Sequence, residues 1–256
     1  MATTMTFAPE ALPHRAVVAL RGDGILPFLH NILTCNVESL IQGQIAYGAL
    51  LSPQGKILHD VFVHHDGDVV MIDCEGTARV DLIAKLKLYR LRAKFEIAAV
   101  DDVEVVAGEG TAFDPRLAAL GKRGVFLKGK HAAGVRYDDA RYLAGVADSA
   151  EICSNRFFPH EANFDLLGAV DFKKGCYIGQ EVVSRMQHRG TARSRIMPVV
   201  FENDQSTDEI RVADVLIGEI LGRRGKSALA LVRLDRLADV GDVPGISFGR
   251  PDWMAG

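Results

Sequence analysis

Short runs of apolar residues recur along the first hundred positions, and polar turn residues separate them. Three of these runs have the length and composition of β-strands and cover residues 45–51, 57–63 and 69–73. The turns between them are Ser-Pro-Gln-Gly at 52–55 and Asp-Gly-Asp at 66–68. Because such short connections join strands that pair with each other, the pattern predicts an antiparallel meander.

Two other segments of this region have helical periodicity. Asp23 can serve as the N-cap of the first helix. The apolar positions of the two helices are Phe28, Leu29, Ile32 and Leu33, and then Leu82, Ile83, Leu86 and Tyr89. A short strand is expected before them at 17–20, and a run of period two follows at 91–97. Strands and helices in this order predict a small α+β layer sandwich.

The rest of the chain has weaker patterns. Residues 108–134 are rich in glycine and charge, and we expect a loop there with a short helix near 115–120. A strand is expected at 142–147, and a helix can begin at 149–151. From Ile196 onward, short apolar runs alternate with glycine and aspartate turns, which predicts a small β-barrel or sandwich. These runs cover 196–201, 215–220, 228–234 and 246–248.

Length, composition and charge exclude several classes of protein. The 256 residues exceed a typical single domain, so two or three substructures are expected. With 48% apolar and 25% charged residues, the composition is that of a soluble globular protein. The formal net charge of −3 argues against an electrostatic nucleic-acid binder. No apolar run approaches the roughly 18–20 residues of a membrane span, so we expect neither nucleic acid nor a membrane as a direct partner.

The four cysteines, Cys35, Cys74, Cys153 and Cys176, are widely spaced and form no C-x-x-C pair. This spacing is neither a zinc motif nor a disulfide framework, and it suits a reducing environment. It also offers no local ligand set for a resident iron–sulfur cluster, so no metal site is expected. The N-terminal segment has no basic start followed by an apolar stretch, and Arg15 is its only arginine before residue 20. We therefore expect a cytoplasmic protein.

The most distinctive stretch is Lys-Lys-Gly-Cys-Tyr-Ile-Gly-Gln-Glu at residues 173–181. It places Cys176 between two lysines and a predicted helix that continues from Glu181 to a stop at Gly190. A thiol before a helix N-terminus and beside ammonium groups should ionise more easily than a free thiol. Considered alone, Cys176 could equally be a small buried apolar residue. The glycine, lysine, glutamine and glutamate residues around it favour a functional loop.

This stretch, followed by Arg185, resembles the signature Lys-Gly-Cys-Tyr-x-Gly-Gln-Glu of the YgfZ-type folate-binding proteins. These proteins are relatives of the glycine-cleavage T-protein, an aminomethyltransferase, and they assist the assembly and repair of iron–sulfur clusters. Other segments resemble the same family in the same order, namely 28–37, 47–60, 158–164 and 218–234. The resemblance is strong over 158–190 and loose over 101–140.

The resemblance implies a T-protein-like α+β fold in three parts. Residues 1–44 and 101–192 would form a discontinuous α+β body that carries the cysteine loop. Residues 45–100 would form a ferredoxin-like part, and residues 193–256 a C-terminal β-barrel. The three parts would surround a central cleft, and the cysteine loop would close one wall of it.

The resemblance also implies a tetrahydrofolate site, with Cys176 as the reactive group. A pterin ring presents two parallel N–H donors, and the carboxylate of Glu161 could accept both. From the residues alone, a solvated surface glutamate is the favoured interpretation. Six cations from Lys173 to Arg195 could attract the anionic tail of a folate, or could form a solvated face that complements a helix dipole. The implied folate-binding residues are Asn36, Glu161, Asn163, Lys174, Tyr177, Gln180, Glu181 and Arg185.

One position departs from the family pattern. Thr34-Cys35-Asn36 stands where the relatives commonly have Thr-Asn-Asp, and the T-protein needs that aspartate for aminomethyl transfer. The amide of Asn36 can neither hold a negative charge nor accept a proton usefully. The leading hypothesis is therefore a tetrahydrofolate-binding accessory protein that acts on iron–sulfur client enzymes or assembly proteins. The alternative on the same fold is a tetrahydrofolate-dependent aminomethyl or other one-carbon transferase.

A third hypothesis belongs to another class, a thiol-dependent enzyme with Cys176 as its nucleophile. Such an enzyme requires a histidine within hydrogen-bonding distance of the thiol as a base. His160 and His188 are the candidates nearest in the sequence. The sequence does not show whether either one approaches the thiol.

Overall fold

The fold is described from a computed structural model for residues 7–190, 192–203 and 207–255. The outermost residues of the predicted first and last parts, 1–6 and 256, lie outside this range. The first of its antiparallel sheets has the strand order β3-β4-β5-β2-β6. Its strands are β2 (Arg15–Arg21), β3 (Ile45–Leu51), β4 (Ile57–Asp66), β5 (Val69–Glu75) and β6 (Glu96–Val100). The predicted meander β3-β4-β5 is confirmed, and β2 and β6 extend it.

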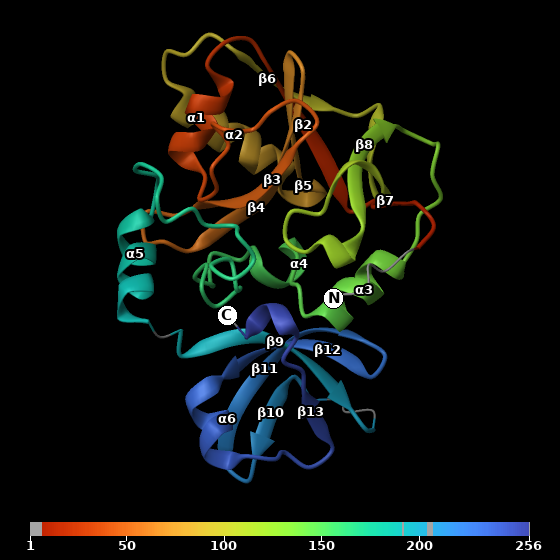
Figure 1. Ribbon diagram of the computed structural model, residues 1–256, viewed down its shortest axis with the longest axis vertical. Coiled ribbons are helices and arrows are strands. Elements are labelled where there is room, and N and C mark those ends of the chain that lie inside the picture. The colour runs from red at the N-terminus through yellow and green to blue at the C-terminus, as the bar shows by residue number, and fades with distance from the viewer. Residues whose placement is uncertain (1–6, 191, 204–206, 256) are drawn as a thin grey trace.

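Both faces of this sheet are covered. The helices α1 (Ile25–Ile32) and α2 (Arg79–Arg90) share one apolar core with one face, and Figure 1 shows them together at the top of the molecule. Tyr47, Phe62 and Asp73 are successive cross-strand neighbours, so their side chains share the opposite face. This opposite face is directed toward the rest of the protein. Charged side chains on it, such as that of Asp73, are therefore buried in the interior.

The start of α1 differs from the prediction. Its N-cap is Gly24, with φ 78, and no side chain caps the helix. The left-handed conformation suits glycine and shifts the cap one residue beyond Asp23. The predicted capping role of Asp23 is therefore wrong.

The second sheet has the order β1-β7-β8. Its strands are β1 (Glu10–Ala11), β7 (Val103–Phe113) and β8 (Lys122–Leu127). The loop predicted over 108–134 is therefore wrong at 108–113 and 122–127, which are strand, whereas the 3-10 helix Ala118–Leu120 lies where a short helix was expected. Gly108 and Gly110 have positive φ and lie where the register between β7 and β8 shifts. These glycines accommodate a bulge rather than end the strand.

Two helices follow this sheet, α3 (Arg136–Ala144) and α4 (Ser149–Ile152). The strand predicted at 142–147 is wrong, because Tyr142 belongs to α3. Tyr137, Ala140 and Ala144 of that helix are buried at helical spacing. The helix expected at 149–151 is confirmed, and Asp148 with Glu151 forms a capping box at its start.

The C-terminal sheet has the order β10-β11-β12-β9-β13 and is blue at the bottom of Figure 1. Its strands are β9 (Ser194–Phe201), β10 (Glu209–Val212), β11 (Val215–Arg224), β12 (Ser227–Arg233) and β13 (Ile246–Phe248). It has its own apolar core, to which α6 (Leu234–Val240) contributes. The four predicted strand runs are confirmed, whereas β10 and α6 were not predicted. The α+β class with a C-terminal barrel-like sheet is thus confirmed.

The signature helix α5 (Gln180–Arg189) ends at Gly190 as predicted. Short 3-10 helices cover Gly76–Ala78, Ala118–Leu120 and Asp252–Met254. The exact division into three parts stays a prediction. Strand β2, from the segment before residue 45, lies within the sheet that residues 45–100 build.

Candidate functional site

The cysteine loop, defined as residues 171–179, is anchored at its first residue. The backbone N–H of Asp171 donates to the carbonyl of Thr34 (3.0 Å). The Oδ1 atom of Asp171 accepts hydrogen bonds from the backbone N–H groups of Lys173 (2.8 Å) and Lys174 (3.2 Å). Such an aspartate turn fixes the direction in which the chain leaves the anchor.

The ammonium group of Lys174 anchors the loop a second time. It donates to the carbonyls of Leu33 (2.6 Å) and Cys35 (2.9 Å), and also to that of His30. The carbonyls of His30 and Leu33 lie at the C-terminal end of α1, where the last carbonyls of a helix have no donor within the helix. Burial lowers the pKa of Lys174. Its side chain therefore holds the loop on α1 and is not free to bind an anionic ligand tail.

The far end of the loop is anchored by two apolar side chains. Tyr177 is buried in a cluster that includes Tyr47, and Ile178 packs against the core beneath α1 and α2. Burial raises the pKa of Tyr177 to about 12. Cys176 lies between these anchors and the lysines, and its side chain is exposed. The loop therefore carries an exposed thiol and not a small buried apolar residue.

Gly179 joins the loop to α5 and needs to be glycine. It is the N-cap of the helix, with φ 78. A Cβ atom there would lie 2.6 Å from the carbonyl oxygen of Ser52 and 3.0 Å from the Cα of Gly55. The first hairpin turn therefore touches the start of the signature helix. A Cβ atom on Gly175, the first glycine of the motif, would meet nothing within 4 Å, so a glycine is not required there for space.

We expect Gly179→Ala to lower the free energy of unfolding by about 1–3 kcal/mol, since it places a Cβ in a strained left-handed conformation. Contact with the Ser52 carbonyl adds to this loss. Gly175→Ala is the matched control and should stay within about 0.5 kcal/mol of the parent. Urea unfolding of the two variants measures the difference, and equal losses would contradict the close approach.

A cleft of about 560 Å³ lies beside the loop. Its lining includes Asn36 after α1, Tyr47 on β3, and Asp171, Phe172 and Lys173 of the loop. This volume is within the range of small-molecule sites. Two aromatic side chains beside a few polar groups suit a flat heteroaromatic ring.

The segment after α1 gives the cleft one polar and one thiol residue. Asn36 is exposed, and its side-chain oxygen accepts the backbone N–H of Glu38 (3.1 Å). Cys35 is buried, and burial raises the pKa of its thiol to about 12. A Cβ on Gly48 would lie 2.5 Å from the Cys35 Sγ, so this thiol is tightly packed. Cys35 is protonated at neutral pH and is no second reactive thiol there.

Glu161 and Asn163 do not line this cleft. The Oε2 atom of Glu161 accepts the backbone N–H of Phe158 (2.8 Å). Asn163 is buried, and its amide donates to the carbonyl of Ile196 (2.8 Å) and accepts from Arg195 (3.1 Å). The structure thus places Glu161 in a local turn and Asn163 at the junction with β9.

The implied residues of α5 also point elsewhere. Gln180 donates from its side chain to the carbonyl of Gly175 (3.3 Å), which braces the cysteine loop. Glu181 and Arg185 form an exposed ion pair one helical turn apart. Of the implied folate-binding residues, Asn36 alone is among the described residues that line the cleft.

The two candidate histidines have other surroundings. The Nε2 atom of His160 lies 3.0 Å from the side-chain oxygen of Gln187, and its ring stacks near Phe172 at 5.9 Å. His188 is exposed. In the part of the chain that the structure describes, neither candidate histidine is therefore hydrogen-bonded to Cys176 as the third hypothesis requires.

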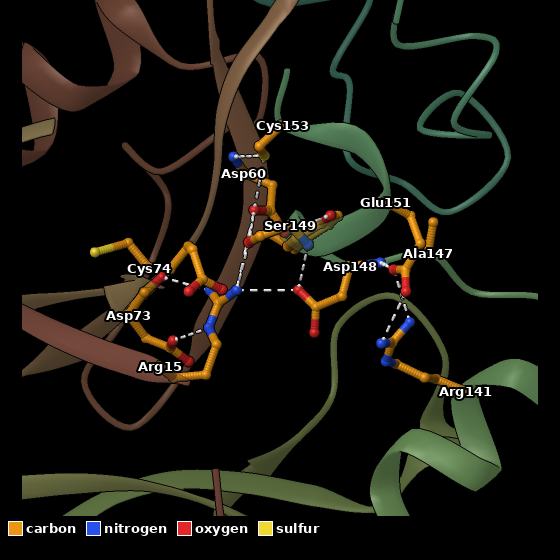
Figure 2. A network of polar contacts seen from close by, with 12 residues as sticks. Arg15, Asp60, Asp73, Cys74, Arg141, Ala147, Asp148, Ser149, Glu151 and Cys153 are labelled. Carbon is orange, nitrogen blue, oxygen red and sulfur yellow. Dashed lines mark hydrogen bonds and ion pairs between the residues drawn. The ribbon is translucent and has the colours of Figure 1, made fainter. Parts of the chain in front are cut away.

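A buried charged network, which the sequence did not reveal, connects the first two sheets with α4. Figure 2 shows Arg15 at its centre. Its guanidinium donates to Asp73 (2.7 Å), Asp148 (3.0 Å) and Ser149 (2.8 Å). Arg123 of β8 donates to the same Asp73 carboxylate (2.7 Å). The side chains of Arg15 and Asp73 are 0% exposed, so these ion pairs lie in the protein interior.

One branch of the network reaches the cleft. The hydroxyl of Tyr47, a cleft residue, donates to the Oδ2 atom of Asp60 (3.1 Å). The Oδ1 atom of Asp60 accepts from Ser149 and from the thiol of Cys153 (3.2 Å). Burial raises the pKa of Tyr47 well above its usual value, so the hydroxyl remains a donor. The network thereby fixes the aromatic wall of the cleft.

A sequence signal for this network exists. Asp60 and Asp73 stand between apolar residues of β4 and β5, on the same face as Phe62. A charged residue at an inward-facing strand position must be paired when it is buried. The partners Arg15 and Arg123 come from other strands. The sequence therefore indicates that the carboxylates are buried, but it does not indicate which side chains they pair with.

Two further searches of the described ranges gave negative findings. No group of three or more His, Cys, Asp or Glu side chains in these ranges is placed to hold a metal ion. The helices there are all too short or too polar to cross a bilayer.

Comparisons with known proteins agree with the architecture. The family described as CAF17, C-terminal beta-barrel domain, matches residues 193–256. The crystal structure of the glycine cleavage system aminomethyltransferase T from Bartonella henselae superposes with a TM-score of 0.70. The match covers 89% of this chain and 78% of that chain, at 15% sequence identity. At this identity the likeness shows the fold.

The sequence is similar to fungal proteins named iron-sulfur cluster assembly factor IBA57 homolog, mitochondrial. The protein from Pyricularia oryzae is 34% identical over 75% of this chain and 57% of its own length. The protein from Mycosarcoma maydis is 31% identical over 78% of this chain and 58% of its own length. The protein from Chaetomium globosum is 28% identical over 94% of this chain and 75% of its own length. The chain thus spans somewhat more than half the length of the first two.

These names correct the expected cytoplasmic location, because the similar proteins are named mitochondrial. The expectation depended on the cysteine spacing and on the composition of the N-terminal segment. The spacing reflects reducing surroundings, and neither feature identifies a compartment. The T-protein-like fold that the sequence implied is confirmed. This chain therefore has the aminomethyltransferase fold, and its sequence is similar to that of proteins named as iron–sulfur cluster assembly factors.

Proposed function

We propose that this chain is a tetrahydrofolate-binding accessory protein of the YgfZ type for the assembly or repair of iron–sulfur clusters, and that it acts through Cys176. The observation that carries the proposal is an exposed thiol on a loop fixed at both ends beside a ligand-sized cleft. The names of the similar proteins support the role in cluster assembly. The fold shared with an aminomethyltransferase supports a reduced folate as the ligand.

The proposed role of Cys176 depends on how the loop is held. Asp171 and Lys174 bind the first half of the loop to the segment after α1, and Tyr177 is buried after it. A partner can therefore reach the thiol without any unfolding of the core. Cys176 would contact the iron or sulfur of a cluster that a client enzyme or an assembly protein carries. The cluster is then cargo, and its other ligands belong to the partner.

The cleft has the groups that a reduced folate requires. Tyr47 and Phe172 supply aromatic walls for the pterin ring, and Asn36 supplies an amide at the rim. The Oδ1 atom of Asp171 serves the loop, but its Oδ2 atom accepts no hydrogen bond from the described residues. A pterin N–H could donate to it in a charge-assisted hydrogen bond. Lys173, exposed at the same rim, could pair with the carboxylates of the folate tail. Tetrahydrofolate, when bound, supplies a carrier for one-carbon units.

Tetrahydrofolate binding tests the folate half of the proposal. We expect Asp171→Asn to weaken binding by about 1.5–3 kcal/mol, the usual contribution of a hydrogen bond to a charged group. Asparagine keeps the Oδ1 acceptor that the loop uses, so the variant should fold normally. Calorimetric titration of the parent and the variant gives the affinities.

Glu161→Ala in the same titration tests the residue that the family resemblance implied. A loss of affinity in this variant, with none in Asp171→Asn, would place the pterin at Glu161 and outside this cleft. If the parent protein did not bind tetrahydrofolate, the proposal that it is a folate-binding protein would be disproved.

An activity assay on the same purified protein distinguishes the accessory role from the alternative, a one-carbon transferase. The fold favours that alternative. The amide of Asn36, however, lacks the negative charge that would stabilise the transition state. The loss of such a group typically lowers the rate by about 10²–10³. The protein is incubated with tetrahydrofolate and an aminomethylated lipoyl carrier. Turnover at ordinary enzyme rates would establish the transferase, and its absence supports the accessory role.

A further inference from the structure

The outer face of α2 carries an apolar stripe that no part of the described chain covers. Val80, Ala84 and Leu88 follow each other at intervals of four, and Leu91 comes just after the helix ends. Val80, Leu88 and Leu91 are 78%, 68% and 85% exposed. At 100° per residue these positions lie opposite the helix face that packs on the first sheet. Exposed leucines at helical spacing indicate a binding face more than scattered ones do.

The backbone at Leu91 has a conformation that leucine rarely adopts. The N–H of Ala93 donates to the carbonyl of Arg90 (3.1 Å), so Leu91 is the first central residue of a turn. Its φ of 52 and ψ of −109 match the type II′ turn, which favours glycine at this position. A strained and almost fully exposed leucine costs stability without adding to the core. This cost is understandable if the side chain has a binding role.

Exposed cations flank the stripe. Lys87 on the helix and Arg92 and Lys94 after it are exposed, and no ion pair engages them among the described residues. Two other cations of the segment are occupied, since Lys85 pairs with Asp81 (3.5 Å) and Arg90 binds the carbonyl of Phe95. The protein as a whole has a formal charge of −3, so this local positive charge is a distinct feature.

We propose that the surface formed by Val80, Ala84, Lys87, Leu88, Leu91 and Arg92, the α2 surface, binds a protein partner. The partner would present a segment with apolar side chains flanked by aspartate or glutamate. Charge complementarity steers such an encounter, and the apolar stripe provides the contact area. A helix of this length covers only part of a standard interface, so the complex should be transient.

A protein fits this surface better than an anionic lipid bilayer. Helices that bind in the bilayer interface present a broad apolar face with tryptophan, phenylalanine or leucine. The stripe on α2 is narrow and has no aromatic residue, and Asp81 is exposed beside it. The opposite side of the helix is buried, so α2 cannot rotate to present a wider face.

The proposal does not depend on folate binding or on the chemistry of Cys176. The two surfaces are nevertheless part of one packed unit. Ile178 of the cysteine loop packs against the same apolar core as α1 and α2. A partner held at the α2 surface would therefore be bound to the unit that carries the loop.

Photo-crosslinking in cells followed by titration tests the proposal. A photoreactive amino acid replaces Ala84 in the full-length chain, and the crosslinked protein is identified, purified and titrated against the parent chain. We expect Leu88→Ser to weaken this binding about tenfold or more. Leu143→Ser, which removes a leucine 63% exposed on α3, is the matched control and should leave it unchanged.

Charge gives a second independent readout. Lys87→Glu should weaken binding and make it less dependent on salt. Salt screens the attraction between the cations of the α2 surface and an acidic partner, and the variant has less of this attraction. Lys122→Glu, at an exposed lysine on β8, is the charge-matched control.

Leu91→Gly separates binding from folding. It should relieve backbone strain and raise the melting temperature by roughly 2 °C or more, while weakening partner binding. A variant that is more stable and yet binds less well cannot be explained by misfolding.

Other outcomes would overturn the proposal. No crosslink from Ala84 would do so, as would equal effects of Leu88→Ser and Leu143→Ser. A crosslink to a second copy of this chain would show a homodimer instead. Cosedimentation with vesicles of phosphatidylcholine and phosphatidylserine that Leu88→Ser abolishes, without any protein crosslink, would show a membrane surface.

Discussion

Replacing Asp73 by alanine should lower the free energy of unfolding by about 3–5 kcal/mol, as breaking a buried ion pair usually does. Asp73 accepts hydrogen bonds from both Arg15 (2.7 Å) and Arg123 (2.7 Å), and its side chain is 0% exposed. Without the carboxylate, two guanidinium groups lose a shared partner in the interior. Urea unfolding of the purified variant measures the loss.

Glu209→Ala is the control for this experiment. Glu209 pairs with Arg211 at 2.7 Å, a distance like those around Asp73, but both side chains are about half exposed. Such surface pairs contribute about 0–1 kcal/mol. If the two variants lost equal stability, the network around Asp73 would be far less important than its burial indicates.

Acid should cause a similar loss in the parent protein. Burial alone would raise the pKa of Asp73, but Arg123 and Arg15 outweigh it and hold the pKa well below its usual value. The pKa of Asp148 is lowered in the same way, since Arg15 and Arg116 outweigh its burial. A carboxyl group with a lowered folded-state pKa stabilises the protein above its unfolded pKa of about 3.9, and this contribution is lost as the pH falls below that value.

Melting temperatures between pH 7 and pH 2.5 therefore test the network without mutation. The parent should lose stability steeply below about pH 4, where the unfolded carboxyl groups bind protons more readily than the folded ones. Asp73→Ala should show a shallower fall, because one of these groups is already absent. Parallel curves for the two proteins would argue against a lowered pKa at Asp73.

Cys176→Ser should reduce the activity of iron–sulfur enzymes in cells that lack the natural copy to roughly the level of the deletion. The thiol is exposed, and no hydrogen bond to it is formed among the described residues, so the fold and tetrahydrofolate affinity should stay nearly intact. A serine hydroxyl is not ionised at neutral pH and is a much poorer ligand and nucleophile than a thiolate. Enzyme activities in complemented cells, with and without oxidative stress, provide the measurement.

Cys74→Ala is the matched control for loss of a thiol. Cys74 is buried in the core beneath α1 and α2, so its removal should leave client activity in place. Full rescue by Cys176→Ser would disprove the thiol half of the proposed function. The folate half, which depends on the cleft, would be unaffected by that result.

Most of the helices and strands could be predicted from local patterns in the sequence. The short apolar runs within 45–73 predicted three strands, and the short turns between them predicted their pairing as a meander. The end of α5 followed from Gly190, and the C-terminal strands followed from apolar runs between turn residues. The predictions failed where local composition misleads, as in the glycine-containing strand β7, whose pairing with β8 overrides its weak strand propensity.

The site was determined from the sequence only in part. The motif around Cys176 showed a loop before a helix, and an exposed thiol follows from it. The motif could not show that the ammonium group of Lys174 donates to the carbonyls of Leu33 and Cys35. The side chains of Glu161 and Asn163, which the family resemblance implied for folate binding, are likewise used by a local turn and by β9.

Tertiary structure alone decided which polar groups meet. Arg15, Asp73 and Arg123 come from three strands of two sheets, and the spacing of 50 residues between Asp73 and Arg123 has no period that a sequence pattern could show. Secondary structure depends on neighbours within a few positions, whereas a buried ion pair depends on the register and packing of distant strands. The sequence therefore determined most of the elements and the loop that carries Cys176. Only the packing of these elements determined the cleft, the network and the face of α2 that the described residues leave uncovered.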